Sequence, residues 1–287
     1  MDHASKVTGF EWIPLARIGA SGHHGGMNTI LIALALSLSA VSDDTSLAAP
    51  PCSCFDTTIS STNAPPPTPT GEYDVFDIRG WTVRVNPALL ADPTLWHAVR
   101  EELDHQLYAI TRVVPSPALD RIREVEIWAE LEMPKTACMC YHVSRGWLVP
   151  NGYNGDKEGT VEIGNARAFL EWTKGQPWMV LHELAHGYHH QVFGYDDASI
   201  IEAFERSRDA GYYDLVGHIS GKPRRHYALT NQMEWFAETT EALYGTNDFH
   251  PYVRSELREV DPEGAALVER LWRSPDVSTT SQDRAGS

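Results

Sequence analysis

The chain of 287 residues is short of positive charge. It has 23 Lys and Arg against 39 Asp and Glu, which gives a formal net charge of −16 at neutral pH. Proteins that bind the nucleic-acid backbone neutralise its phosphates with clustered Lys and Arg. The densest basic stretch here is the pair Arg224 and Arg225, which is too small to form a basic face. The composition therefore excludes nucleic acid as a partner, and it leaves solubility as the simplest role of the acidic residues.

A long apolar run is also missing. The longest covers residues 29–40 (TILIALALSLSA), whereas a membrane-spanning helix needs about 20 residues. We therefore expect no stable membrane insertion of the mature protein. The run is typical of a secretory signal peptide over 27–48, within an N-terminal extension of residues 1–48 in which Met27 is an alternative start. The sequence predicts a secreted or cell-envelope protein, or a cytoplasmic one if this segment is not a signal.

Cysteine is scarce. The four cysteines form two C-x-C pairs, Cys52 with Cys54 and Cys138 with Cys140. Zinc ribbons separate their paired cysteines by at least two residues, so this spacing disfavours a four-cysteine zinc site. Two disulfides would suit an exported protein, and the sequence does not choose among the three possible pairings.

Local composition divides the chain into segments. Pro, Ser and Thr dominate residues 49–71, which are typical of a linker without a core. The polar residues 274–287 predict a disordered tail. Between these segments, residues 72–273 contain enough apolar side chains for a single folded domain, which the motifs below make the catalytic domain.

Hydrophobic periodicity within this domain predicts strands before helices. The expected strands are a hairpin over 75–85 and single strands over 125–131, 138–142 and 160–163. The expected helices are 92–113, 177–193, 197–210, 230–245 and 262–272. Pro177 and Gly194 supply start and stop signals for the second helix. This order predicts an α+β fold, with a small N-terminal sheet and a mostly helical C-terminal part, rather than a doubly wound parallel sheet.

The segment 182–186, His-Glu-Leu-Ala-His, contains a potential metal site. Helical residues four apart are rotated by about 40° and displaced by about 6 Å, so His182 and His186 can bind one ion. Glu183 lies beside them and can reach a metal-bound water. Three successive histidines on a straight helix would spread over about 12 Å, so we expect His189 and His190 to lie behind the ligands or on the surface. The simpler alternative is a surface helix with incidental histidines.

A third ligand must come from another segment, because position 192 is Val where the extended motif requires His. The run 231–238 (NQMEWFAE) places Glu234 and Glu238 on one helix face. The alternative is that Glu234 closes a capping box with Asn231 and that Glu238 is solvated. The upstream motif favours Glu234 as the third ligand of a single Zn²⁺.

These motifs carry a resemblance. The set HELAH, a loop Tyr and E-W-F-A-E resembles the catalytic domain of the anthrax lethal factor type of gluzincin peptidases over roughly residues 160–245, and it is similar to a group of uncharacterised bacterial peptidases. The resemblance implies a zincin-like metallopeptidase domain in which Glu234 binds zinc. It also implies that Tyr227, seven residues earlier, faces the metal and assists the transition state. Nothing resembles the toxin's delivery or docking domains, so its substrate is not transferred.

The resulting hypothesis is a zinc-dependent peptidase in which Glu183 activates a zinc-bound water and Tyr227 stabilises the oxyanion. Glu238 would orient His182 or His186. The strand 160–163 would pair with an extended peptide or protein substrate. The alternatives are a catalytically inactive zinc-binding domain that docks a protein partner, a structural domain without metal, and for Tyr227 a packed loop aromatic. Cleavage specificity, endo- or exopeptidase action and oligomeric state do not follow from the sequence.

Overall fold

The protein is seen in a computed structural model that describes residues 66–133 and 136–274. The predicted N-terminal extension and signal peptide, most of the linker, Cys52, Cys54 and all but the first residue of the predicted tail lie outside these ranges. Five strands form the sheet: β1 (Asp74–Ile78), β2 (Trp81–Val85), β3 (Ile127–Ala129), β4 (Met139–Tyr141) and β5 (Val161–Ile163).

Helices make up most of the remainder of the described chain. The α-helices are α1 (Pro87–Leu90), α2 (Pro93–Val113), α3 (Ser116–Arg123), α4 (Arg145–Leu148), α5 (Ala166–Trp172), α6 (Met179–Tyr188), α7 (Ala198–Asp209), α8 (Gln232–Tyr244), α9 (Arg254–Val260) and α10 (Pro262–Arg273). Four short turns of 3-10 or π-helix are η1 (Thr70–Glu72), η2 (Gly155–Lys157), η3 (His189–Phe193) and η4 (Tyr227–Leu229).

The sheet is mixed, with the order β1-β2-β3-β5-β4. β2, β3 and β5 run parallel, while β1 and β4 are antiparallel to their neighbours. The predicted hairpin is confirmed, and its turn uses Arg79 and Gly80 at φ 56 and 90. The prediction that strands precede helices is only partly right, because parallel neighbours need a crossover connection. Helices α1, α2 and α3 therefore lie between β2 and β3, within a fold that is mixed α and β as predicted.

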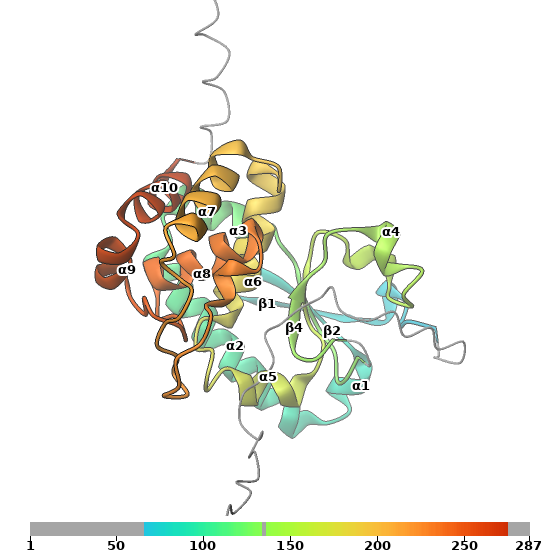
Figure 1. Cartoon of the computed structure of the whole chain (residues 1–287). Helices are drawn as coiled ribbons and strands as arrows, with labels where there is room; N and C mark the ends of the chain where they lie inside the picture. The colour runs from blue at the N-terminus through green and yellow to red at the C-terminus, as the bar shows by residue number, and fades with distance from the viewer. Residues whose placement is uncertain (1–65, 134–135, 275–287) are drawn as a thin grey trace, which may run out of the picture. The chain divides into compact units, whose positions relative to one another are not determined.

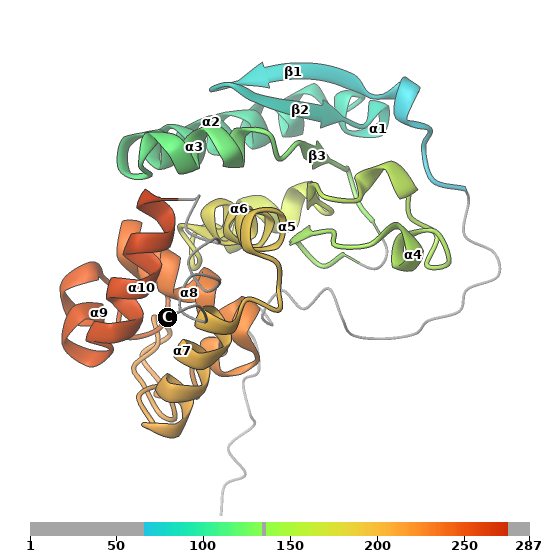
Figure 2. The same ribbon diagram turned by 90° about the horizontal axis from the view of Figure 1, so that it is seen from above.

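The core forms where α6 lies between the sheet and the C-terminal helices. Figure 1 shows α7–α10 together on one side of α6, with the strands on the other side, and Figure 2 shows the same order from above. The alternate residues Trp81, Val83 and Val85 of β2 are fully buried, as are Val99 and Leu103 of α2. The apolar residues that recur every two positions in β2 and about every four in α2, and that predicted these elements, are thus the residues on their buried faces.

Several short helices were not predicted from the sequence. α3, α5 and α9 have 8, 7 and 7 residues, too few for a clear apolar repeat. α3 and α9 also begin without a side-chain cap, whereas α5 has one. In α5 the Asn165 side chain accepts from the Ala168 N–H at 2.9 Å. Among the described residues, no helix has both the length and the apolar composition needed to cross a membrane.

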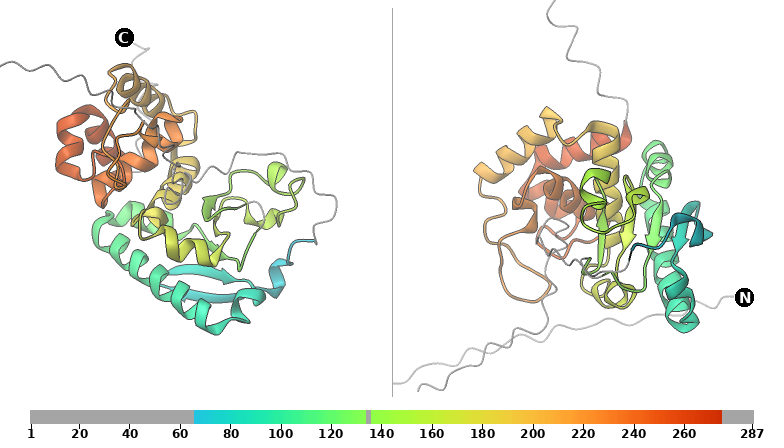
Figure 3. Two further views of the ribbon diagram at one scale, coloured as in Figure 1. Left: turned by 60° about the horizontal axis from the view of Figure 1, so that its bottom comes forward. Right: turned by 90° about the vertical axis from the view of Figure 1, so that its right-hand side faces the viewer.

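The predicted helix 177–193 is interrupted. α6 ends at Tyr188, and the chain continues through the π-helical turn η3, which closes when the Gly194 N–H donates to the His189 carbonyl at 3.0 Å. Gly194 has φ 80, as expected for a residue that stops a helix. The two views of Figure 3 show the chain leaving α6 through this turn toward α7.

Cys138 and Cys140 do not form a disulfide with each other. Both are buried at β4, and the Cys138 Sγ lies 3.5 Å from the Met179 Sδ of α6. The pairings that would involve Cys52 or Cys54 fall outside the described residues.

Candidate metal centre

The two motif histidines lie on a helix that is buried on every side. All ten residues of α6 are buried, because β4, α2 and α3 pack against one part of its surface and α8 against another. The alternative of a surface helix with incidental histidines is therefore wrong. His182 and His186 point the same way, and their Nε2 atoms lie 3.1 Å apart.

The third member of the cluster comes from the first turn of α8. The Glu234 Oε2 lies 3.1 Å from the His182 Nε2 and 3.2 Å from the His186 Nε2. Asn231 caps this helix, and its side chain accepts from the Met233 and Glu234 N–H groups at 2.9 Å. Because the Glu234 side chain turns toward the histidines, it does not close the alternative capping box. The predicted ligands His182, His186 and Glu234 are thus brought together.

The spacing of these three atoms suits one small cation. Ligand atoms at about 2.1 Å from a tetrahedral zinc ion are separated by roughly 3.4 Å, and those observed are 3.1 to 3.2 Å apart. The Nδ1 of His182 contacts the Glu241 Oε1 at 2.7 Å. A carboxylate only accepts, so Nδ1 carries a proton, and Nε2 is the nitrogen left to bind a metal ion. This nitrogen faces the Glu234 oxygen at 3.1 Å, so either a proton or a metal ion between them would stabilise the arrangement.

Electrostatics in the cluster also favour positive charge. Burial alone would lower the pKa of His182, but the hydrogen bonds to Glu234 and Glu241 outweigh burial and raise this pKa well above its ordinary value. Burial alone would raise the pKa of Glu234, but the neighbouring His186 and His182 hold it below its usual range. The negative charge that binds a proton here would also bind a metal ion.

The carboxylate that orients His182 differs from the one expected. Glu241, one helical turn beyond Glu238 on α8, makes the 2.7 Å contact with the His182 Nδ1. Glu238 Oε1 lies 3.9 Å from the same nitrogen, too far for a hydrogen bond. The other Glu238 oxygen accepts from Asn247 Nδ2 at 2.6 Å. Glu241 was not identified from the sequence, although its seven-residue spacing from Glu234 places both on the same helical face.

Glu183 and Tyr227 border a cavity of about 200 Å³ beside the cluster. Glu183 is buried, which raises the pKa of its carboxyl to about 7 despite the opposing effect of His186 and His182. The Tyr227 hydroxyl donates to the Glu234 Oε1 at 3.4 Å. The two residues predicted to assist catalysis therefore lie at the wall of one cavity, next to the three potential ligands.

The expectation that residues 160–163 pair with a substrate is wrong. β5 lies between β3 and β4, so both of its edges are already hydrogen-bonded.

β4 is instead the last strand of the described sheet, and it packs against α6. The His142 N–H donates to the Thr160 carbonyl, and the Cys138 carbonyl accepts from Gly164. Because such pairs alternate along an antiparallel ladder, the backbone polar groups of Met139 and Tyr141 point away from β5.

The two additional histidines have different surroundings. His189 is fully buried, packed on the rings of Tyr195 and Phe236, and burial lowers its pKa to about 3. It is therefore a neutral core residue rather than a surface residue or one that supports a ligand. His190 is partly buried, and its Nδ1 lies 2.9 Å from the Tyr141 hydroxyl.

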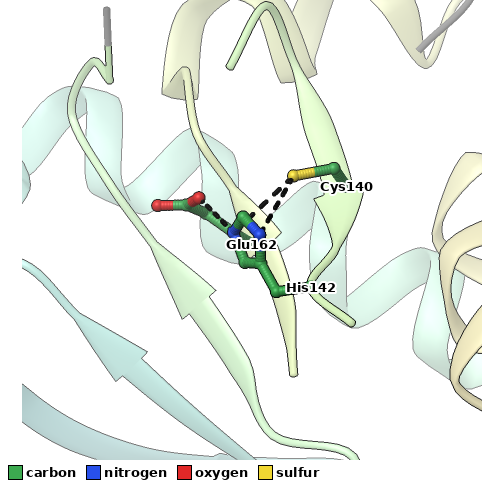
Figure 4. A group of neighbouring side chains, drawn as sticks. All are labelled: Cys140, His142 and Glu162. Atoms are coloured by element: carbon green, nitrogen blue, oxygen red, sulfur yellow. Dashed lines mark hydrogen bonds and ion pairs between the residues drawn. The ribbon is translucent and has the colours of Figure 1, made fainter. Parts of the chain in front are cut away.

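A second buried grouping joins Cys140 and His142, next to β4, with Glu162 of β5 (Figure 4). The His142 Nε2 lies 2.6 Å from the Glu162 Oε2 and 3.7 Å from the Cys140 Sγ. The nitrogen–oxygen distance matches a charge-assisted hydrogen bond and is shorter than the separation of two ligands on zinc. Although its donor atoms are close enough together to hold an ion, the geometry of this grouping favours a proton.

Lys157 extends this grouping into a buried polar network. Its ammonium bonds to Glu162 and lies 2.6 Å from the Glu130 Oε1, which also accepts from the Tyr73 hydroxyl. Lys157, Glu130 and Glu162 are all at most 3% exposed. Burial alone would raise the pKa of Glu162, but Lys157 and His142 lower it to about 2. A cation already occupies the charge-balancing position, which further disfavours a metal ion at Glu162.

The structure thus contains buried His, Glu and Cys groupings that could hold a metal ion. Among them, His182, His186 and Glu234 have the spacing that best suits a metal ion. Comparisons of the chain with protein-family models, with curated proteins and with solved structures find no match.

Proposed function

We propose that this chain is a zinc-dependent peptidase of the gluzincin type, with His182, His186 and Glu234 as the ligands of one zinc ion. The observation that carries the proposal is the convergence of three ligand atoms to within 3.1 to 3.2 Å of one another beside a cavity bordered by Glu183 and Tyr227. A zinc ion at this position would supply Lewis-acid charge and lower the pKa of water that it binds.

Glu183 is the general base in this proposal. A pKa of about 7 lets its carboxyl exchange a proton near neutral pH, as a group that alternates between base and acid must. Glu183 accepts the proton of the attacking water, and it then delivers that proton to the departing amine nitrogen of the peptide bond. Its burial excludes bulk water as a competing proton acceptor.

Tyr227 and Glu241 assist the zinc ligands and Glu183 in the proposed reaction. The Tyr227 hydroxyl borders the same cavity, where it can donate a hydrogen bond to the oxygen that gains negative charge in the transition state. Glu241 fixes the tautomer and the orientation of His182 through its Nδ1. The outer edge of β4, which no described strand covers, offers backbone donors and acceptors to an extended peptide, and this supports a peptide or protein as the substrate.

Metal content and cleavage test this proposal together. The purified full chain is expected to contain close to one zinc per molecule and to cleave members of a broad peptide library. Glu183→Gln should keep the zinc and lose the cleavage, because Gln cannot take a proton. Zinc-loaded protein whose cleavage is unchanged by Glu183→Gln would refute the assigned base. Full zinc occupancy with no cleavage by the parent chain would favour the alternative of an inactive zinc-binding domain that docks a protein partner.

A further inference from the structure

The cavity beside the metal cluster has a second wall that the proposed chemistry does not use. Arg224 and Arg225 line the same cavity as His182 and Glu183. They lie in the loop that leads to Tyr227, three and two residues before that tyrosine. A substrate group held by these arginines would therefore lie close to the bond that is cleaved.

Neither arginine is neutralised by the part of the chain that the structure describes. No carboxylate in that part lies within 4.0 Å of either guanidinium, although the chain has 39 acidic residues. Arg225 donates to a neutral acceptor, the Leu229 carbonyl, at 3.0 Å. Arg224 is half-buried and its side chain makes no hydrogen bond or ion pair there, so its charge is available to a ligand.

Three of the four carboxylates that line the cavity are engaged by partners in its wall, and the fourth is Glu183. Glu241 contacts His182 at 2.7 Å, and Glu238 accepts from Asn247 at 2.6 Å. The Asp248 Oδ2 lies 3.3 Å from the His218 Nε2. Because these contacts hold the acids in place, they are not available to pair with the arginines.

The backbone around the arginines is well anchored. The N–H and carbonyl of Arg224 pair with those of Val216, both at 2.8 Å, so the loop between them is closed at its base. The N-terminal end of α6 borders the cavity through Met179, has no acidic residue in its first turn and has no side-chain cap. The positive end of this helix dipole adds to the attraction for an anion.

We propose that Arg224, assisted by Arg225, forms a carboxylate-binding subsite next to the scissile bond. The inference rests on the proposed peptidase function and adds its substrate class: peptides with a carboxylate near the cleaved bond. A guanidinium is suited to this role because it can donate two parallel hydrogen bonds to a carboxylate. The carboxylate can belong to an Asp or Glu side chain or to the C-terminus of the peptide, and the two sources differ in the peptides that test them.

The first experiment compares cleavage of matched peptides by the zinc-loaded full chain. One series carries Glu, Gln or Lys at each position around a single cleaved bond, and a second series has a free or an amidated C-terminus. We expect kcat/KM to be about 10- to 100-fold higher for the peptide with the carboxylate, the range for hydrogen bonds to a charged group. A preference confined to the first series identifies a side chain, and one confined to the second identifies the chain end. Equal rates throughout both series would overturn the inference.

Variants of Arg224 test whether this residue causes the preference for the carboxylate peptide. Arg224→Gln should abolish it, mainly by lowering kcat/KM for the carboxylate peptide, and Arg224→Lys should retain part of it. Arg224→Glu should reverse it toward Lys, a gain that a misfolded variant could not produce. Arg270→Gln is the matched control, since Arg270 is exposed on α10, outside the cavity wall. An unchanged preference in Arg224→Gln and Arg224→Glu would overturn the assignment.

A binding measurement separates failure of this inference from failure of the proposed function. With zinc-loaded Glu183→Gln, calorimetry should give a dissociation constant about 10- to 100-fold lower for the carboxylate peptide than for its amide counterpart. Arg224→Gln in the same background should remove the difference. Preferential binding without any cleavage by the parent chain would refute the peptidase and retain the subsite. Cleavage without preferential binding would retain the peptidase and refute the subsite.

Discussion

Replacing Glu241 tests whether the structure identifies the residue that supports His182. Glu241 Oε1 lies 2.7 Å from the His182 Nδ1, and its side chain is 5% exposed, so water screens this contact little. In Glu241→Gln the amide oxygen can still accept from Nδ1–H, but the negative charge is lost. Hydrogen bonds to charged groups contribute about 1.5 to 3 kcal/mol and neutral ones about 0.5 to 1.5 kcal/mol. The expected loss is about 1 to 1.5 kcal/mol, or roughly 5- to 10-fold in zinc affinity.

Glu241→Ala should weaken zinc binding more strongly. It removes the acceptor altogether and leaves a buried N–H without a partner, and the loss of such supporting contacts typically lowers metal affinity about 10- to 100-fold. Zinc affinity would be measured by competition with a chromophoric chelator at fixed pH, with circular dichroism to verify the fold of each variant.

Glu238→Gln is the matched control. Its Oε1 is 3.9 Å from the His182 Nδ1, and a Gln oxygen at this position could still accept from Asn247, which now donates at 2.6 Å. We expect zinc affinity close to that of the parent protein. The reasoning would be refuted if Glu238→Gln weakened zinc binding more than Glu241→Gln, because the residue chosen from the sequence would then be the one that orients His182.

Further predictions concern the buried network, the cavity and one close contact. Lys157→Met removes the cation that bridges two buried carboxylates, so urea denaturation should show a loss of about 3 to 5 kcal/mol in the free energy of unfolding. The pKa of Glu162 is lowered to about 2, so its contribution to stability is present above the ordinary value of 4.5 and is lost as pH falls from there toward 2; Glu162→Gln should flatten the fall in unfolding free energy over this window. Tyr227→Phe should lower kcat of the proposed peptidase about 100-fold with zinc content unchanged, as for loss of one oxyanion donor, and an unchanged kcat would restrict Tyr227 to packing. A Cβ at Gly245 would lie 2.1 Å from the ring of Trp178, so overpacking in Gly245→Ala should lower the free energy of unfolding by about 1 to 3 kcal/mol, which a lower thermal midpoint would reveal.

Long elements were predictable because their periodicity follows from burial of one face. The hairpin β1–β2 and the helix α2 appear with nearly the expected ends, and Asp92 caps α2 by accepting from the Leu95 N–H at 3.0 Å. The shortest strands, β3, β4 and β5, were anticipated as longer segments. Their pairing order was not, since strands of 3 residues carry too little pattern to indicate their neighbours. The expectation for β5 failed for this reason: its sequence does not show that β4 covers its outer edge.

The candidate site likewise contains some residues that could be predicted from the sequence and others that could not. The four-residue spacing of His182 and His186 already implied that both imidazoles point in one direction, because helix geometry links spacing to direction. Glu234 was chosen from a pattern and a resemblance, and its position near the histidines depends on how α8 packs against α6. Glu241, His189 and the network around Lys157 could not be assigned, since burial and partner distances depend on residues far apart in the chain.

The sequence by itself determined the elements with a strong local repeat, the helical face shared by the two histidines and the scarcity of positive charge. Tertiary packing alone decided which carboxylate supports His182, which strand ends the described sheet and where Arg224 and Arg225 lie. The arginines show the difference clearly: as two basic residues in an acidic chain they carried no functional signal. Beside a cavity where no described carboxylate pairs with them, the same two charges become candidates for binding a ligand, because the surroundings of a charged group govern its interactions.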